Sequence, residues 1–193
     1  MAMPLRCKCG QVRGEVEAAR SYARAICYCT YCQAYARFLG QPDVTDAQGG
    51  TDIVAMPPSA VRFTAGSDRL ACISMSAKGP LRWYAGCCRT PLGNTAREAK
   101  LPYAGMVIAC LDVDPAAVDD AFGTSRAVLS AGTAIAPVRK RPVATALGGM
   151  RLLVKLVATR LRGDRASPFF DATTGKPVSA PERVDAKRYG RPD

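Results

Sequence analysis

The distribution of cysteine constrains this chain more than any other feature of its sequence. Nine cysteines occur among 193 residues, and there is no histidine. Seven of the nine form three tight groups, which are Cys7 and Cys9, then Cys27, Cys29 and Cys32, then Cys87 and Cys88. The absence of histidine excludes a Ser-His-Asp triad, a Cys-His pair and an HExxH zinc site. Any chemistry must therefore use thiols, carboxylates, Tyr, Lys, Arg or a metal.

The redox compartment decides how such thiols are interpreted. The first residues, MAMPLRCKCG, lack the apolar run of a secretory signal, so we expect a cytoplasmic protein. In a reducing compartment, clustered cysteines are more often metal ligands or catalytic thiols than a disulfide framework. Two alternatives are that the thiols are small buried apolar groups, or that Cys27 forms a disulfide with Cys29 or Cys32. The isolated Cys72 and Cys110 lie in apolar runs and are predicted to be core residues.

The spacing of the second group favours a zinc site with an open position. Thiolates are strong ligands of tetrahedral zinc, and a C-x-C-x-x-C pattern can place three sulfurs around one ion. Three protein ligands and one open position are typical of reactive zinc, whereas four ligands are typical of structural zinc. Cys27, Cys29 and Cys32 are therefore candidate catalytic residues as well as candidate metal ligands.

The charge of such a site leaves its role open. Three thiolates outweigh the two positive charges of the ion by one, which weakens its Lewis acidity and favours a structural or thiol-exchanging role. Arg24, Arg37 and Arg89 are candidates to offset this surplus because they lie near the cysteines in the sequence. The sequence therefore supports both a catalytic role and a zinc-stabilised binding or scaffold role.

The first two thirds of the chain is predicted to fold mainly into β-strands. Short apolar runs separated by Gly and Pro are typical of small antiparallel sheets. We expect a hairpin within residues 5–16 and further strands within 23–28, 54–56, 61–64, 70–75, 81–84 and 106–111. Residues 115–122 are predicted to form a short helix, with Asp114 as its N-cap and Pro115 at its first position.

The last third of the chain is strongly basic. Residues 1–137 contain 14 Lys and Arg against 11 Asp and Glu, whereas residues 138–193 contain 13 against 5. We therefore expect a zinc domain over residues 1–135 and a basic extension over 136–193. Residues 150–162 have helical periodicity. The predicted apolar face contains Leu153, Leu156, Val157 and Leu161, and the predicted basic face contains Arg151, Lys155 and Arg162.

Three partners are possible for this helix. It can dock on the β domain, lie on an anionic membrane, or contact nucleic acid. Docking is the expected arrangement, because a small sheet gains stability when an amphipathic helix covers one face. We expect no membrane span, since Arg151, Lys155 and Arg160 interrupt the most apolar stretch.

The order of these motifs resembles a known family. LRCKCGQVRG, then ICYCTYC, then VRFTAGSDRLACISMSAKGPLRWYAGCCRTPLGN are similar to the glutathione-dependent formaldehyde-activating enzymes and their centromere-protein-V relatives. The resemblance covers about residues 5–95, or to Leu111 at most. It implies a β-tent fold of small antiparallel sheets with two zinc sites. It also implies carbon–sulfur lyase chemistry on an adduct of an aldehyde with a thiol such as glutathione.

The resemblance also implies which cysteines share a metal. Cys7, Cys9 and Cys88 would belong to a structural site, and Cys27, Cys29 and Cys32 to the reactive one. The distal motif departs from the family pattern F-C-x-x-C-G-T, because Ala85 replaces its first cysteine and Arg89 its glycine. Cys87 is a substitute fourth ligand, although adjacent residues usually point apart. The first site is therefore a three-sulfur site, a rearranged four-sulfur site, or empty.

Overall fold

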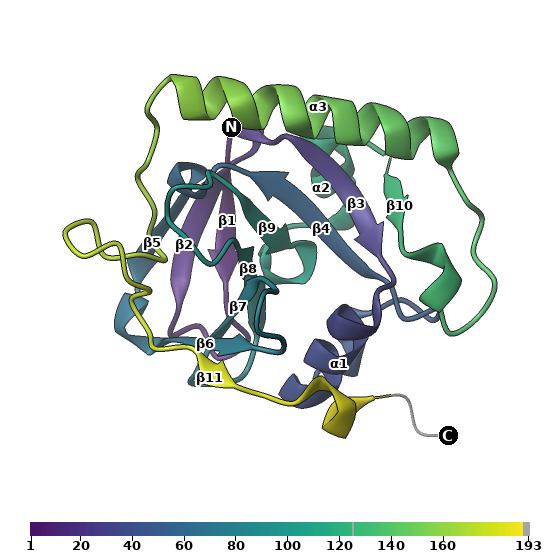
Figure 1. Ribbon diagram of the computed structural model, residues 1–193, viewed down its shortest axis with the longest axis horizontal. Coiled ribbons are helices and arrows are strands. Elements are labelled where there is room, and N and C mark those ends of the chain that lie inside the picture. Colours follow the sequence, from purple (N-terminus) through teal and green to yellow (C-terminus); the bar gives the residue numbers. More distant parts are fainter. Residues whose placement is uncertain (125, 191–193) are drawn as a thin grey trace.

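A computed structural model of the chain describes residues 1–124 and 126–190. Its strands are β1 (Ala2–Arg6), β2 (Arg13–Glu17), β3 (Ala23–Cys27), β4 (Thr51–Met56), β5 (Val61–Ala65), β6 (Leu70–Ser74), β7 (Leu81–Ala85), β8 (Pro91–Thr95), β9 (Ala104–Val107), β10 (Ala127–Leu129) and β11 (Glu182–Arg183). They form a three-stranded sheet in the order β1-β2-β5 and an eight-stranded sheet in the order β10-β3-β4-β9-β8-β7-β6-β11 (Figure 1). The predicted mainly β fold is confirmed.

Strand pairing is antiparallel through both sheets except at the two ends of the larger one. There, β10 pairs with β3 and β11 pairs with β6 in parallel. In the smaller sheet, β1 and β2 form the predicted hairpin, with Met3 opposite Val16. Gly14 is required where β2 meets β5, because a Cβ at this position would lie 2.3 Å from the carbonyl oxygen of Arg62.

The main hydrophobic core contains residues of both sheets and of the C-terminal segment. Trp83 is fully buried, its ring centroid lies 5.2 Å from that of Phe169, and its Nε1 donates to Thr95 Oγ1 at 2.9 Å. Cys72 and Cys110 are 3% and 0% exposed, which confirms that they are core residues. Because Phe169 lies beyond residue 136, the basic extension supplies part of the core of the β domain. The domain boundary near residue 136 stays a prediction.

Within residues 1–124 and 126–190, three α-helices accompany the sheets: α1 (Thr30–Leu39), α2 (Pro115–Phe122) and α3 (Pro142–Leu161). Helix α2 has the predicted bounds, although the Asp114 side chain makes no capping hydrogen bond. Helix α1 was not predicted. Helix α3 begins at Pro142, whereas the predicted helix began at residue 150. The prediction missed the first part of the helix because Gly148 and Gly149 interrupt the apolar periodicity. These glycines do not end the helix.

Helix α3 packs on the β domain through a face that differs from the predicted one. It lies along one side of the molecule, opposite α1 (Figure 1). A Cβ at Gly148 would lie 3.4 Å from the Cβ of Ala127, which shows how closely α3 approaches β10. The basic side chain of Lys155 faces the domain, where its Nζ donates to the Ser21 carbonyl at 2.7 Å. The predicted apolar face therefore points largely toward solvent, with Leu153 59% exposed and Leu161 82% exposed.

Candidate metal centres

Four cysteines from two distant parts of the chain meet in the first cluster. Cys7 and Cys9 lie in the turn between β1 and β2, whereas Cys87 and Cys88 follow β7. The backbone N–H of Gly10 donates to the Cys7 carbonyl at 2.8 Å, and Gly10 has a φ of 75°. This left-handed conformation explains the glycine after the C-x-C pair. The four Sγ atoms all lie within 4.8 Å of one another, so the group could hold a metal ion.

The sulfur–sulfur distances fit tetrahedral coordination. Thiolates about 2.3 Å from a tetrahedral zinc ion are about 3.8 Å from one another. The Sγ atom of Cys87 lies 3.8 Å from that of Cys7, 3.3 Å from that of Cys9 and 3.9 Å from that of Cys88. The adjacent Cys87 and Cys88 are therefore both close enough to the other sulfurs to share one metal ion. The geometry is compatible with the rearranged four-sulfur arrangement, since all four cysteines could hold one metal ion.

A tight turn after β7 makes this possible. The backbone N–H groups of Cys88 and Arg89 both donate to the Ala85 carbonyl, at 3.3 and 2.7 Å. Arg89 has a φ of 58°, the left-handed conformation that glycine adopts most easily. Its side chain is held by a hydrogen bond from Nη2 to the Phe38 carbonyl at 2.7 Å and lies 4.8 Å from the Phe38 ring centroid.

Hydrogen bonds favour an ionised thiol at one position of this cluster, Cys88. The backbone N–H of Val12 donates to Cys7 Sγ at 3.2 Å. Burial raises the pKa of the Cys88 thiol, but hydrogen bonds with Thr90, and from the backbone N–H of Cys9, lower it to about 6. Thiolates are the metal-binding form, so these contacts favour Cys88 as a ligand. Burial, together with hydrogen bonds involving Cys9 and Cys7, raises the pKa of the neighbouring Cys87 thiol to about 12.

The second cluster forms where β3 leads into α1. Cys27 is the last residue of β3, Cys29 is the N-cap of α1, and Cys32 lies in the first helical turn. Helix α1 begins here because Cys29 is extended and its Sγ accepts a hydrogen bond from the backbone N–H of Cys32 at 3.4 Å. The three Sγ atoms lie within 4.8 Å of one another. All three members of the predicted triplet therefore converge.

The N-terminus of a helix favours a thiolate at this position. Hydrogen bonds from the Cys27 and Cys32 thiols lower the pKa of Cys29, and the backbone N–H of Cys32 acts in the same direction. Burial opposes this shift. Hydrogen bonding to the same Cys29 sulfur raises the pKa of Cys27, so these contacts favour the thiolate form at Cys29 rather than at Cys27.

A buried arginine beside the triplet escaped the sequence analysis. Arg82 of β7 is 6% exposed, and its Nη1 and Nη2 lie 3.8 and 3.9 Å from Cys32 Sγ. Among the described residues it forms no ion pair with a carboxylate, and its Cζ lies 5.2 Å from the Tyr35 ring centroid. A buried guanidinium requires a counter-charge, and the ionisable thiols of the triplet lie beside this one.

The three arginines proposed from sequence proximity serve other partners. Arg24 is paired with Asp52 and Asp119, at 2.8 and 2.6 Å. Arg37 donates to the Tyr189 carbonyl, and Arg89 binds Phe38. These contacts hold the side chains of the three arginines with other partners. The cation that lies beside the triplet is Arg82 instead. No local signal marked Arg82, since it lies fifty positions from Cys32 in the sequence.

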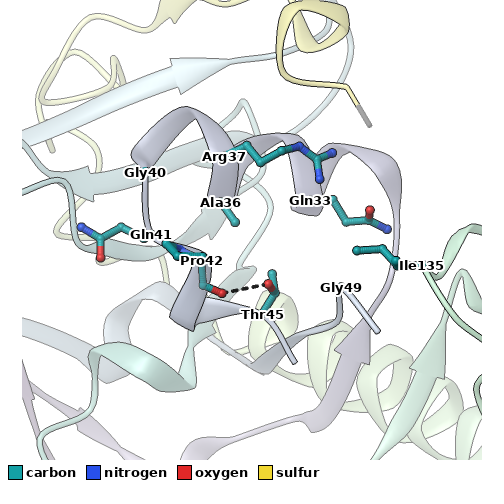
Figure 2. Close-up of a pocket in the computed structure, with 9 residues that line it drawn as sticks. All are labelled: Gln33, Ala36, Arg37, Gly40, Gln41, Pro42, Thr45, Gly49 and Ile135. Atoms are coloured by element: carbon teal, nitrogen blue, oxygen red, sulfur yellow. Dashed lines mark hydrogen bonds between the residues drawn. The ribbon is translucent and has the colours of Figure 1, made fainter. Parts of the chain in front are cut away.

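Two cavities border helix α1. One, of about 370 Å³, is lined by Arg37, Gly40 and Ile135 among others, with Gln33 and Arg37 on its helical side (Figure 2). The other, of about 460 Å³, is lined by Thr30 and Tyr31, which lie between Cys29 and Cys32 in the sequence. Both are large enough for a small ligand. The second therefore places a ligand-sized space next to the helical turn that carries the triplet.

Fold and clusters together define a mainly β protein with two cysteine groups that could each hold a metal ion. The chain belongs to the family described as "Family of unknown function (DUF6151)", whose model matches residues 1–182. No curated protein matches it. A similar solved structure is the crystal structure of a Rhodobacter sphaeroides protein, a structural-genomics target. It is 21% identical with a TM-score of 0.42, over 60% of this chain and 94% of that chain.

Proposed function

We propose that this chain is a zinc protein with a structural four-cysteine site and a reactive three-cysteine site that brings together a small thiol and an aldehyde. The observation that carries the proposal is the incomplete sulfur shell of the triplet beside the buried charge of Arg82. The motif resemblance to formaldehyde-activating enzymes supports the thiol and aldehyde as reactants.

The two clusters differ in the number of ligands they offer. Cys7, Cys9, Cys87 and Cys88 supply the four sulfurs of a closed tetrahedral site. The group around Cys29 contains three sulfurs, and no further Cys, Asp or Glu of the described residues joins it. A tetrahedral ion there keeps one position for an external ligand.

Arg82 determines how reactive such a site is. When bound, zinc would supply a position at which a substrate thiol ionises near neutral pH. The guanidinium of Arg82 balances the single surplus negative charge of three thiolates. With this charge balanced, a negatively charged substrate sulfur can bind the same ion without strong repulsion from the three cysteine thiolates.

The proposed reaction is reversible formation of a carbon–sulfur bond. The sulfur of a thiol such as glutathione attacks the carbonyl carbon of an aldehyde such as formaldehyde. The carbonyl π electrons move to oxygen, which takes up a proton in place of the one lost by the thiol. No oxidant or reductant is needed, and the reverse reaction releases both reactants.

A non-catalytic zinc-stabilised binding or scaffold module is the second candidate. The burial of Cys27 and Cys32, which are 9% and 8% exposed, favours it because an external ligand must reach the centre past both side chains. Nucleic-acid binding through the basic residues 136–193 is a weaker form of this alternative.

Elemental analysis of freshly reduced protein tests the metal sites. We expect two zinc ions per wild-type chain and one in each of the variants Cys29→Ser and Cys88→Ser. A folded, metal-free wild-type protein contradicts both candidate functions.

Exchange between glutathione and formaldehyde, followed by NMR, distinguishes the two candidates. We expect wild-type protein to accelerate the exchange and Cys29→Ser to abolish the acceleration while circular dichroism shows a retained fold. Cys88→Ser is the matched control, since loss of a structural ion leaves the reactive centre in place. Two bound zinc ions without acceleration identify the binding module instead.

A further inference from the structure

Helix α3 carries an apolar stripe on the side that faces away from the β domain. The stripe follows a spacing of three and four residues and contains Val143, Leu147, Met150, Val154, Val157 and Leu161. Each of these side chains is at least 45% exposed, and Leu153 beside them is 59% exposed. Exposed apolar patches of this kind mark sites of interaction with another molecule or a membrane.

The opposite side of α3 is fixed to the domain by polar contacts. Thr159 Oγ1 accepts a hydrogen bond from the buried hydroxyl of Tyr22 at 2.9 Å. Thr145 Oγ1 accepts one from the backbone N–H of Val128 at 3.1 Å. Together with Lys155, these contacts span most of the helix. The outward direction of the apolar stripe is therefore set by the fold.

All charged residues close to the stripe in the sequence are basic. Residues 121–163 contain eight Lys and Arg and no Asp or Glu. Arg139, Lys140 and Arg141 directly precede the helix, and Arg160 and Arg162 lie at its end; all five are exposed. The next acidic residue, Asp164, is already paired with Arg20 and hydrogen-bonded to Ser59.

We infer that α3 is a membrane-binding helix that lies in the surface of an anionic lipid bilayer. The apolar stripe inserts among the acyl chains, and the basic residues at both ends contact lipid phosphates or carboxylates. The β domain stays on the aqueous side, because the contacts of Tyr22, Thr145 and Lys155 hold it against the other helix face.

The charge of α3 and its contacts with the β domain favour binding to a bilayer surface over three alternatives. These are a second copy of the chain, nucleic acid, and a helix that spans the bilayer. A second copy of the chain across the stripe would place basic residues against basic residues, without any acidic partner from residues 121–163. Nucleic acid would meet an apolar centre rather than a continuous basic surface. By length and composition α3 is also long enough to cross a bilayer, with a mean hydropathy of 1.3 over its most apolar window, but spanning would break its contacts with the domain.

Vesicle flotation of the full-length, zinc-loaded chain tests the inference. We expect the protein to float with vesicles of phosphatidylcholine and phosphatidylglycerol, and not with phosphatidylcholine alone. Concentrated salt weakens the binding because it screens the basic residues. Carbonate extraction releases a helix that lies in the surface, whereas it does not release one that spans the bilayer.

Two sets of substitutions separate the apolar and basic contributions. Leu147→Gln with Leu153→Gln is expected to lower partition into anionic vesicles by about tenfold or more. Lys140→Glu with Arg141→Glu is expected to abolish the preference for anionic lipid. Val178→Gln, which replaces a 48% exposed valine outside α3, is the matched control and leaves partition unchanged.

Several outcomes overturn the inference. They are no flotation with anionic vesicles, flotation that the two leucine substitutions do not change, retention after carbonate extraction, and a dimer in light scattering that the leucine substitutions dissociate. Binding to DNA or RNA that outcompetes the vesicles likewise assigns the surface to a different partner.

Discussion

Arg82 has an unusual combination of burial and partners. It is 6% exposed and lies beside Cys32 rather than a carboxylate. Arg82→Leu is therefore expected to weaken zinc binding at the three-cysteine cluster by about 10- to 100-fold, the usual effect of losing a group that supports metal ligands. Competition with a chromophoric chelator measures this affinity.

The control for this substitution is Arg62→Leu, which removes an exposed arginine that is paired with Glu15. It is expected to leave both zinc affinities unchanged. Equal affinities in wild type and Arg82→Leu would show that the guanidinium does not compensate the thiolates.

The backbone conformation of Arg89 shapes the turn that carries Cys87 and Cys88 of the first cluster. At a φ of 58°, a β-branched side chain is strained, whereas glycine is not. Arg89→Val is therefore expected to be less stable to urea unfolding than Arg89→Gly by about 1–2 kcal/mol, with zinc in excess. Both variants lose the contacts with Phe38, so their difference isolates the backbone. Equal stability of the two variants contradicts a turn that requires the left-handed conformation.

For single residues, the sequence was most informative where chemistry depends on residue type. The convergence of Cys27, Cys29 and Cys32, and the burial of Cys72 and Cys110, followed from spacing and apolar context. The sequence left open whether Cys87 joins Cys88 in the first cluster, because this depends on the backbone conformation of the turn that Arg89 completes. Arg82 was missed since long-range strand placement brings it to Cys32.

Among the elements, α3 shows most clearly why a helix can be predicted while its orientation cannot. Its periodicity was visible, yet the face that packs on the domain is determined by polar partners such as Tyr22 and Ser21. Helix α1 escaped prediction because a cysteine, which is not a common N-cap, begins it. Strand β8 was missed because Pro91 and Gly93 interrupt its apolar pattern.

The contact between α3 and the β domain can be tested by removing the hydroxyl group of Tyr22. Tyr22 is 2% exposed, and its hydroxyl contacts both Thr159 Oγ1 and the Pro102 carbonyl, the latter at 3.1 Å. Tyr22→Phe leaves these two buried groups without that partner and is expected to cost about 1–3 kcal/mol of unfolding free energy. Urea unfolding measures the loss.

Tyr31→Phe is the matched control, since Tyr31 is 42% exposed and its hydroxyl can exchange to water. It is expected to change stability by less than about 0.5 kcal/mol. If both substitutions have the same small effect, the contact between Tyr22 and Thr159 does not hold α3 on the domain.

For the whole molecule, the two clusters differ in reach, because only the first connects parts of the chain that are far apart in sequence. The first ties the hairpin of β1 and β2 to the turn after β7, and the second joins β3 to α1. The fold also has a large apolar core around Trp83, and most of the residues in it are not cysteines. Metal binding is therefore expected to add to the stability of an already cooperative structure rather than to replace its core.

Zinc removal tests this relation quantitatively. A ligand that binds only the folded state stabilises it by about 1.4 kcal/mol for each tenfold rise in free ligand above its Kd, for each site. With two sites, the unfolding free energy of the reduced wild-type chain is expected to rise by about 2.8 kcal/mol per tenfold rise in buffered free zinc. In Cys29→Ser the slope falls to about half, because the first cluster alone remains. Urea titrations in chelator-buffered zinc measure both slopes, and a stability independent of zinc, or equal slopes in the two proteins, contradicts two folding-coupled metal centres.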